Sequence, residues 1–238
     1  MIDVHSHILP GMDDGCKDAE ESIAVLKKLA EQKVDTVHAT SHFYANREKL
    51  DHFLQRRELA GQRLAAAMEA SEEPLPKVIL GAEVWYFDGI SRSTSLRPLC
   101  TDGTNILLLE MPFGQWTDRM LGEVVSLKEE RGFSVLLAHI ERYLRCQKRG
   151  ALDWLSQHDI LMQSNAEAFL ERRIARKALK MLEQRQIQLL GTDCHNLTSR
   201  PPNYGDAIRK IRESLGDGAL EYLGEMERLF YQSMEAVH

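Results

Sequence analysis

Short apolar runs alternate with longer amphipathic segments along the chain. Apolar runs of this length predict strands that are buried on both faces, and the segments between them predict helices. We expect seven strands, at residues 2–4, 34–40, 77–85, 105–111, 133–138, 160–164 and 188–191. We expect helices at residues 18–32, 47–70, 117–130, 143–156, 166–184, 204–214 and 220–234. Most of the strands are therefore followed by a helix.

This alternation predicts an α/β fold with a parallel sheet. A closed barrel and an open doubly wound sheet both satisfy the pattern, and a barrel of slightly under eight units fits the length. The chain contains no internal repeat, no low-complexity tract and no linker, and residues 72–76 form a loop rather than a boundary. We therefore expect one domain that spans residues 1–238.

Composition narrows the class of protein. Of the 238 residues, 43% are hydrophobic and 28% are charged, which is enough apolar material for a large core. The formal net charge of −6 excludes nucleic-acid binding that is driven by bulk charge. No segment has the length and hydrophobicity of a membrane span, and the first residues do not resemble a secretory signal. The four cysteines are scattered, so we expect reduced thiols in a cytoplasmic protein.

The ends of the predicted strands carry the candidate chemistry. His5 and His7 follow the first strand two residues apart, so both imidazoles point to the same side of an extended chain. Five other strands end near an imidazole or a carboxylate, and Asp14 follows the first strand in a Gly-containing loop. In a parallel barrel these ends form one face, where active sites lie. The converging side chains are His5, His7, Asp14, His42, Glu83, Glu110, His139, Asp193 and His195.

Five imidazoles and four carboxylates on one face of a barrel are best explained by bound metal. Without cations the carboxylates would repel one another and their pKa values would rise. Nine ligands exceed what one tetrahedral ion needs, so the set suits two or three divalent ions. Mixed imidazole and carboxylate ligands suit manganese, iron or zinc, and the lack of thiolates argues against a structural zinc site.

These residues resemble a known family. The order HxH, Asp, His, Glu, Glu, His and DxH is similar to that of the polymerase and histidinol phosphatase (PHP) superfamily. The opening MIDVHSHILPGMDDG resembles more closely the bacterial metal-dependent protein tyrosine phosphatases found with capsule and exopolysaccharide genes. The segments HIERY (139–143) and GTDCHN (191–196) carry the same resemblance, which covers essentially the whole chain.

The resemblance implies a distorted TIM-like (β/α)7 barrel with a trinuclear site at the carboxyl ends of its strands. His5, His7, Glu83 and Asp193 would hold the first ion. Glu83 would bridge to a second ion, which Glu110 and His139 also bind. Asp14, His42 and His195 would hold the third. The choice of Asp14 over Asp13 rests on the resemblance alone.

The implied reaction is hydrolysis of phosphotyrosine in proteins by a metal-bound hydroxide. Arg142 and Arg200 match the family's phosphate-orienting arginines, and each can offer a forked guanidinium to the phosphate. Manganese is the first metal expected, with iron or zinc as alternatives. The implied protein partner is an autophosphorylated bacterial tyrosine kinase that regulates polysaccharide synthesis or export. The oligomeric state cannot be inferred from the sequence.

Three alternatives compete with this interpretation. Cys194 and Arg200 have the C-x5-R spacing of cysteine-dependent tyrosine phosphatases, but no glycine lies between them to let backbone N–H groups wrap a phosphate. Asp193, next to Cys194, should also raise the pKa of the thiol. A PHP-type enzyme for a small phosphoester, such as histidinol phosphate or a nucleotide, would use the same metals. A metal-stabilised barrel without catalysis, acting as a kinase-binding protein, is the third.

Several residues have two interpretations. His38 is expected in the core rather than at the metals, and Asn165 is equally suited to contact substrate or to hydrogen-bond a strand end. The aromatic residues of the loops could stack on a phosphotyrosyl ring or simply cover the barrel: Phe43, Tyr44, Trp85, Tyr86, Phe87, Phe113 and Trp116. A basic run is expected to be a solvated helix face, with a docking surface for an acidic partner as the alternative: Arg172, Arg173, Arg176, Lys177 and Lys180.

Overall fold

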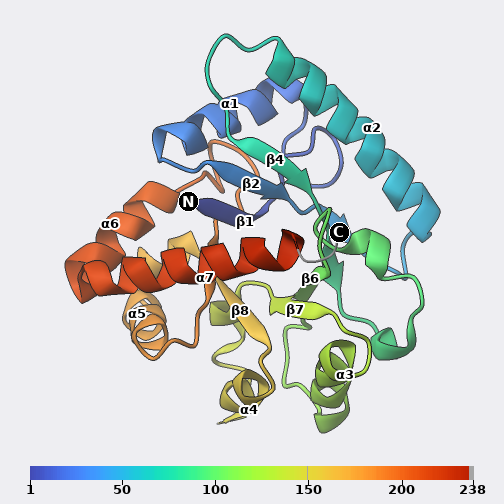
Figure 1. Cartoon of the computed structure of the whole chain (residues 1–238), viewed down its shortest axis with the longest axis vertical. Helices are drawn as coiled ribbons and strands as arrows, with labels where there is room; N and C mark the ends of the chain where they lie inside the picture. Colours follow the sequence, from blue (N-terminus) through green and yellow to red (C-terminus); the bar gives the residue numbers. More distant parts are fainter. Residues whose placement is uncertain (149, 236–238) are drawn as a thin grey trace.

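A computed structural model describes residues 1–148 and 150–235, and side chains up to residue 230 (Figure 1). The strands are β1 (Ile2–Ser6), β2 (Thr36–Ala39), β3 (His42–Phe43), β4 (Lys77–Leu80), β5 (Glu83–Trp85), β6 (Ile106–Glu110), β7 (Ser134–Leu137), β8 (Leu161–Asn165) and β9 (Leu189–Gly191). The α-helices are α1 (Ala19–Glu31), α2 (Leu50–Glu69), α3 (Asp118–Glu129), α4 (Ala151–Gln157), α5 (Ala175–Glu183), α6 (Tyr204–Leu215) and α7 (Asp217–Glu235). The last three residues of the predicted domain lie outside the described residues.

The strands form a distorted parallel β/α barrel. β1 pairs with β2 and β2 with β4, whereas β3, β5, β6, β7, β8 and β9 follow one another in the second sheet, with every pairing parallel. β3 continues the course of β2, and β5 continues that of β4, so the nine strands occupy seven positions around the barrel. A bridge between Ser6 and Cys194 brings β1 back to the segment that follows β9. The barrel interpretation of the sequence is confirmed, and the open doubly wound sheet is wrong.

At one place in the barrel, two of the predicted strands are each divided into two shorter strands. The strand expected at 77–85 is interrupted at Gly81 and Ala82, and the strand expected at 34–40 resumes at His42. The amide of Gly81 donates to the carbonyl of Ala39, whereas the amide of Glu83 reaches the carbonyls of Thr40 and Ser41. This irregular pairing shifts the register just before the site, so that His42 lies opposite Glu83.

Two predicted helices are shorter than expected. The segment 143–156 contains only α4, because Gly150 precedes it with a φ of 86°, which a right-handed helix cannot accommodate. Residue 149 of that segment lies outside the described residues. The segment 166–184 begins with a 3₁₀ turn at Ala166–Phe169 and forms a helix only from Ala175. Residues 171–173 between them are exposed and have no apolar side chain that could pack as a helix face.

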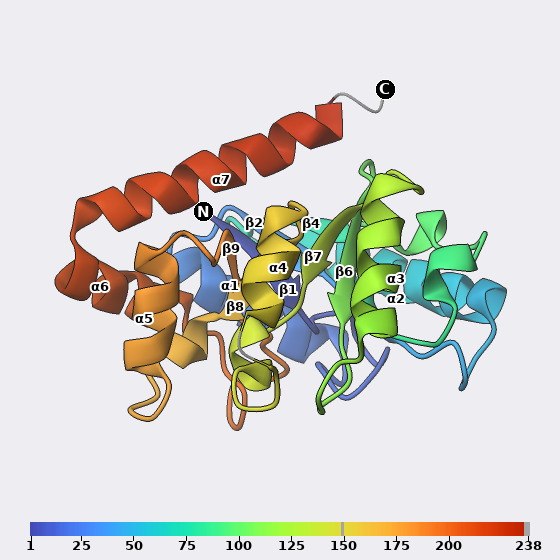
Figure 2. The same cartoon turned by 90° about the horizontal axis from the view of Figure 1, so that it is seen from below.

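The barrel interior is filled at the end opposite the site. An apolar cluster there contains Ile2, Val4, Ile106, Leu108, Leu136, Ala138, Leu189 and Phe230. The helix α7 lies across this end, near the start of β1 (Figure 2). His38 belongs to the same interior, with its ring 5.5 Å from that of Phe230, which confirms its predicted place in the core.

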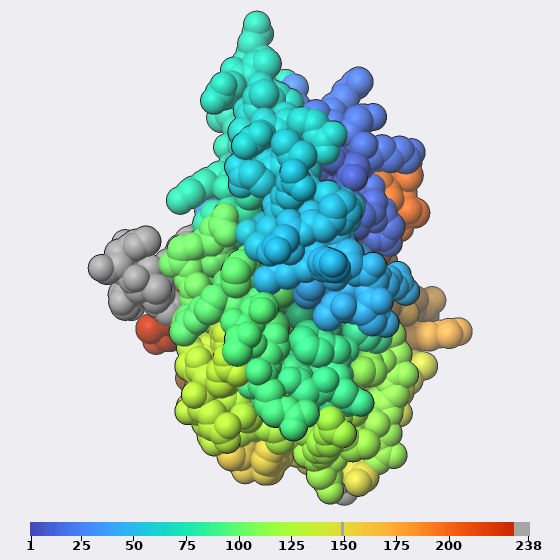
Figure 3. Space-filling view, turned by 90° about the vertical axis from the view of Figure 1, so that its right-hand side faces the viewer, coloured from blue at the N-terminus to red at the C-terminus, as the bar shows by residue number. Residues whose placement is uncertain are grey.

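Helices cover the outside of the barrel. Seen from the side, α2 forms much of the surface, and the residues that follow β5 lie below it (Figure 3). The larger apolar cluster, which includes Leu26, Phe53, Leu64 and Tyr204, fills the layer between helices and strands. Among the described residues no helix combines the length and hydrophobicity needed to cross a membrane.

Candidate metal centre

The predicted ligand residues meet at the carboxyl ends of the strands. Nε2 of His5 lies 3.2 Å from Nε2 of His7. Both nitrogens lie 3.4 Å from Oε2 of Glu83, and Nε2 of His7 lies 3.4 Å from Oδ1 of Asp193. All four side chains are buried. Residues almost 190 positions apart in the sequence therefore share one small volume.

The possible ligand atoms form three groups, and within each group the atoms lie within 4.8 Å of one another. The groups are His5, His7 and Asp193; His7, Asp14, His42 and His195; and His42, Glu83 and Glu110. His139 adjoins the third group, because its Nε2 lies 2.9 Å from Glu83 and 3.4 Å from Glu110. All nine residues expected from the sequence are thus brought together. His7 and His42 each belong to two groups, which the family resemblance alone does not predict.

The structure separates the neighbouring carboxylates Asp13 and Asp14. Nδ1 of His7 donates to Oδ2 of Asp13 at 2.9 Å, and the same oxygen accepts from the amide of His42. Oδ1 of Asp14 instead lies 3.5 Å from Nε2 of His42 and 3.4 Å from Nε2 of His195. Asp13 is therefore placed to orient a ligand, whereas Asp14 faces the candidate ligand atoms themselves.

The charges of the cluster create a strong demand for cations. Burial disfavours the charged form of His139, yet hydrogen bonds to Glu110 and Glu83 raise its pKa to about 9. Burial also opposes ionisation of Asp193, but His5, His7 and Arg142 hold the pKa of that carboxyl well below its usual range. Oε2 of Glu110 is buried and has no hydrogen-bond partner among the described residues, whereas Nδ1 of His42 and Oε2 of Glu83 lie 2.8 Å apart. Lone pairs that are buried without a donor fit divalent metal ions.

A layer of polar residues behind the ligands holds them in place. Nδ1 of His5 lies 3.2 Å from Oε1 of Gln163, and that oxygen also accepts from the amide of His139 at 2.7 Å. Nε2 of Gln163 donates to Oδ1 of Asn165, whose Nδ2 donates to Asp193. Asn165 therefore hydrogen-bonds a candidate ligand, Asp193. Gln163 was missed by sequence reasoning, because a glutamine inside a strand has no motif of its own.

Backbone geometry also marks the site. His139 and Asp193 have φ angles of 33° and 52°, in the left-handed region that residues other than glycine rarely adopt. Strain of this kind is retained where the surrounding structure imposes it, and it concentrates at functional sites. Gly191 permits the close approach of β9 to β1, because a Cβ there would lie 2.5 Å from Cβ of His5.

Two arginines stand at the mouth of the cluster. Nη2 of Arg142 and Nη2 of Arg200 lie 2.5 and 2.6 Å from Oδ2 of Asp193. Nη1 of Arg200 also lies 2.6 Å from Nε2 of His195. About a third of each side chain is exposed, so both guanidinium groups can face an incoming anion.

The structure divides the aromatic residues of the loops. Phe43, Tyr86 and Trp116 are buried and belong to the core, and Phe87 packs against it. Tyr44, Trp85 and Phe113 form a continuous arc, with ring centroids 5.9 and 6.2 Å apart. The arc begins beside His42 and ends with Phe113 stacked 6.2 Å from the ring of His139. Phe113 is 58% exposed, although it is a large apolar side chain.

The environment of Cys194 argues against a cysteine nucleophile. Its side chain is buried in the apolar core and belongs to none of the three ligand groups. Burial, followed by the charge of Asp3, raises the pKa of this thiol well above its usual range. Asp193 contributes in the direction expected from the sequence, but burial is the main cause. A buried thiol of raised pKa is a poor nucleophile.

The fold and the site together define a class of protein, a parallel β/α barrel with an imidazole and carboxylate cluster at the catalytic end of its strands. The chain belongs to the family described as capsular polysaccharide synthesis, CpsB/CapC, whose model matches residues 1–233. The resemblance inferred from the opening residues is thereby confirmed.

Several relatives carry a functional name. The tyrosine-protein phosphatase CpsB of Streptococcus pneumoniae is 30% identical over 233 residues, with 91% of each chain covered. The tyrosine-protein phosphatase YwqE of Bacillus subtilis is 24% identical, over 91% of this chain and 85% of its own.

Solved structures share the fold. One from a study of YwqE from Bacillus subtilis and CpsB from Streptococcus pneumoniae, described there as metal-dependent tyrosine phosphatases, has a TM-score of 0.83. It is 22% identical, and the match covers 98% of this chain and 95% of that one. A putative histidinol phosphatase from Listeria monocytogenes is more distant, with a TM-score of 0.50 and 12% identity.

Proposed function

We propose that this protein is a metal-dependent phosphatase that hydrolyses phosphotyrosine in proteins. The observation that carries the proposal is the convergence of nine ligand-type side chains beside Arg142 and Arg200. Membership of the CpsB/CapC family and the names of the relatives support the same reaction.

The proposed ligands to the divalent ions are the nine residues of the cluster: His5, His7, Asp14, His42, Glu83, Glu110, His139, Asp193 and His195. Two or three ions fit this number of ligands, and manganese is the metal we expect, with iron or zinc as alternatives. When bound, such ions lower the pKa of coordinated water and neutralise the charge of the phosphate.

Two arginines of the chain, Arg142 and Arg200, would orient the substrate phosphate and supply positive charge to it. The transition state of phosphoryl transfer carries its charge on equatorial oxygens, and two forked guanidinium groups can hold these oxygens. Arg142 and Arg200 reach the cluster from its open side, where the ester must enter. The phenol of tyrosine has a pKa of about 10, which makes it a better leaving group than the hydroxyl of serine. The enzyme therefore has less need of a general acid.

The aromatic arc of Tyr44, Trp85 and Phe113 supports an aryl phosphate as substrate. Its rings run along the rim from one candidate ligand, His42, to another, His139. An offset or edge-on contact between aromatic rings is worth about 1 kcal/mol beyond the area that it buries. A phosphate held by the cluster would place the attached ring against this arc, whereas an alkyl phosphate would leave it unused.

The proposed protein substrate is an autophosphorylated tyrosine kinase of polysaccharide synthesis or export, and the proposed location is the cytoplasm. The family's description links the chain to capsular polysaccharide synthesis, which supports this context. All four cysteines are free, in keeping with a reducing compartment.

One comparison tests the proposed function. The protein is stripped of metal with a chelator and then reloaded with Mn²⁺, and kcat/KM is measured on a phosphotyrosyl peptide and on histidinol phosphate. We expect no turnover without metal, recovery with Mn²⁺ and a clear preference for the peptide. Turnover by the stripped protein would contradict the metal mechanism. A preference for histidinol phosphate would favour the small-ester alternative, and bound metal without turnover would favour a binding protein.

A further inference from the structure

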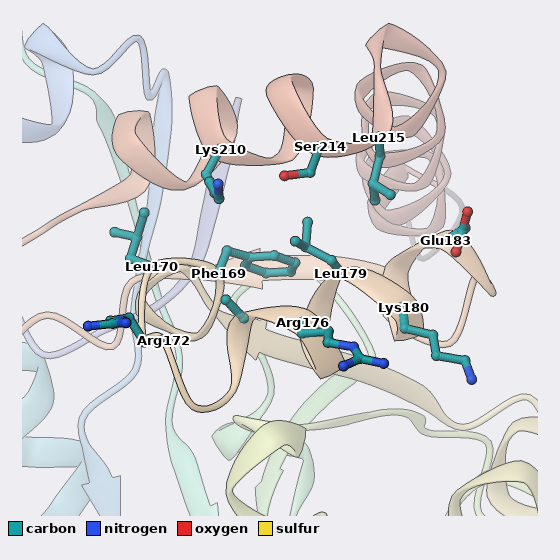
Figure 4. Close-up of a pocket in the computed structure, with 11 residues that line it drawn as sticks. Phe169, Leu170, Arg172, Arg176, Leu179, Lys180, Glu183, Lys210, Ser214 and Leu215 are labelled. Carbon is teal, nitrogen blue, oxygen red and sulfur yellow. The ribbon is translucent and has the colours of Figure 1, made fainter.

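We propose that a groove between α5 and α6 binds an acidic segment of the phosphotyrosyl substrate protein. The groove has a volume of about 730 Å³ and is formed by the chain that follows β8, by α5 and by α6 (Figure 4). This inference rests on the proposed function, because it assigns a second contact to the same substrate.

The floor of the groove is apolar. Leu179 on α5 and Leu215 on α6 line it and are partly exposed, whereas Phe169 of the 3₁₀ turn is itself buried. Leu170, at one end, is 37% exposed. Apolar side chains that stay accessible between two helices can accept the side chains of a bound peptide. A small inorganic anion would make no use of such a floor.

The rim of the groove is basic. Arg172, Arg176 and Lys180 stand along the α5 side, Lys210 stands on α6, and Glu183 is the acidic residue of the lining (Figure 4). Within residues 1–148 and 150–230, none of the four cations forms an ion pair. By contrast, Arg209 and Arg212, also on α6, pair with Asp206 and Asp217.

This arrangement changes the interpretation of the basic run. On a simple solvated helix face the cations would not border a groove, as they do here. The chain has a net charge of −6, so four unpaired cations at one place are a local feature and do not reflect the overall composition. The cations surround an apolar floor, so their chemistry matches a peptide that carries carboxylates together with some apolar side chains.

The groove lies within reach of the candidate metal centre. Asn165, at the end of β8, donates to Asp193. Leu170, at the groove, follows Asn165 by five residues, so the two are at most about 18 Å apart. An extended peptide with its phosphotyrosine at the metals would therefore reach the groove after about six residues.

The test uses the full chain loaded with Mn²⁺. The variant Arg172→Glu/Arg176→Glu/Lys180→Glu reverses three exposed charges. The probe is a peptide with phosphotyrosine, a neutral spacer of about six residues and a run of glutamates, and a matched peptide carries glutamines instead. We expect kcat/KM on the glutamate peptide to fall about tenfold through KM. The glutamine peptide and free phosphotyrosine should be hydrolysed at the wild-type rate.

A matched control separates docking from general charge. The variant Lys28→Glu/Arg119→Glu/Arg228→Glu makes the same change in net charge at exposed positions on α1, α3 and α7. It should leave all three substrates unaffected. An equal loss in this control, or no loss in the groove variant, would overturn the proposal.

A binding measurement keeps the two proposals distinguishable. Fluorescence anisotropy with the unphosphorylated glutamate peptide reports on the groove even if no substrate is turned over. Wild-type binding that is lost in the groove variant supports docking, and equal binding by both proteins overturns it. If the groove variant instead changes the mass measured by light scattering, the groove holds a second copy of the chain and the substrate proposal is wrong.

Discussion

Nδ1 of His7 donates to the carboxylate of Asp13 at 2.9 Å, and this contact turns Nε2 of the same imidazole toward Glu83 and Asp193. A hydrogen bond on one ring nitrogen fixes the tautomer and leaves the other free for metal. Burial favours a neutral Asp13, but His7 holds the pKa of this carboxyl well below its usual range. Asp13 is therefore ionised and can orient His7 at any pH where the protein would work.

The pair Asp13→Asn and Asp14→Asn tests this division of roles. Loss of an orienting partner weakens metal binding by about 10–100-fold, so the first variant should bind Mn²⁺ more weakly yet recover full kcat at saturating metal. The second variant removes a proposed ligand and should keep a reduced kcat at any metal concentration. Calorimetric Mn²⁺ titration and steady-state kinetics measure both. The opposite pattern would exchange the roles of the two carboxylates.

Arg142→Lys and Arg200→Lys should each lower kcat/KM on a phosphotyrosyl peptide by about 100-fold, since a lysine cannot provide the forked pair of donors. Each variant should still bind Mn²⁺ as the wild type does, which calorimetry checks. If both variants stay fully active, the arginines have no part in phosphate orientation.

Cys194→Ser is the matching negative test. The thiol is buried away from the ligand groups, so we expect this variant to retain kcat within about threefold. The measurement is kcat on the same peptide with Mn²⁺ at saturation, with thermal melting to confirm folding. A folded but inactive variant would revive the cysteine mechanism.

Phe113→Ala should lower the preference for aryl over alkyl phosphates. Phe113 is exposed at the end of the aromatic arc, so its removal costs little stability, whereas the substrate ring loses a stacking contact worth about 1 kcal/mol, or roughly fivefold in kcat/KM. The readout is the ratio of kcat/KM for phosphotyrosine to that for phosphoserine. The exposed Leu59→Ala, on α2, serves as the control. An unchanged ratio would remove the arc from substrate recognition.

Gly191→Ala should destabilise the protein by about 3 kcal/mol, because the added Cβ would lie 2.5 Å from Cβ of His5. Urea unfolding measures the change in the free energy of unfolding. Gly122→Ala is the matched control, since nothing lies within 4 Å of the added Cβ and alanine favours the helix α3. We expect this control to be neutral or slightly stabilising. Equal stability of the two variants would mean that β9 can move away from β1.

His38 should make the fold sensitive to acid. Burial lowers the pKa of this imidazole to about 3, whereas an unfolded chain would titrate near 6.5. Between these two pH values the unfolded chain carries a proton on His38 that the folded protein does not bind. The free energy of unfolding is therefore highest above about pH 6.5 and falls by about 1.4 kcal/mol for each pH unit below that value. His38→Leu should remove about 2 kcal/mol of the loss measured by urea unfolding between pH 7 and 5 in chelator. An unchanged pH dependence would show that the unfolding of the barrel does not expose His38.

Much of the fold could be predicted from local patterns. The apolar runs place strands within a few residues of their observed bounds, as at 105–111 and β6 (Ile106–Glu110). The break in 77–85 could not be predicted, because it depends on pairing with the neighbouring strand, where the amide of Gly81 donates to Ala39 and the amide of Glu83 reaches Thr40 and Ser41. In the same way, the short strand at His42 exists only because Glu83 lies opposite it.

The sequence by itself determined the type of chemistry, because imidazoles and carboxylates at strand ends show which atoms are available to bind metal. It also determined a parallel α/β fold, since apolar runs between helices predict strands that are buried on both faces. Only the tertiary structure decided that Asp14 rather than Asp13 faces the ligand atoms and that Gln163 holds His5. It also decided which three of seven aromatic rings form the rim. These choices depend on distances between residues far apart in the chain, and such distances exist only after the strands have closed around a common axis.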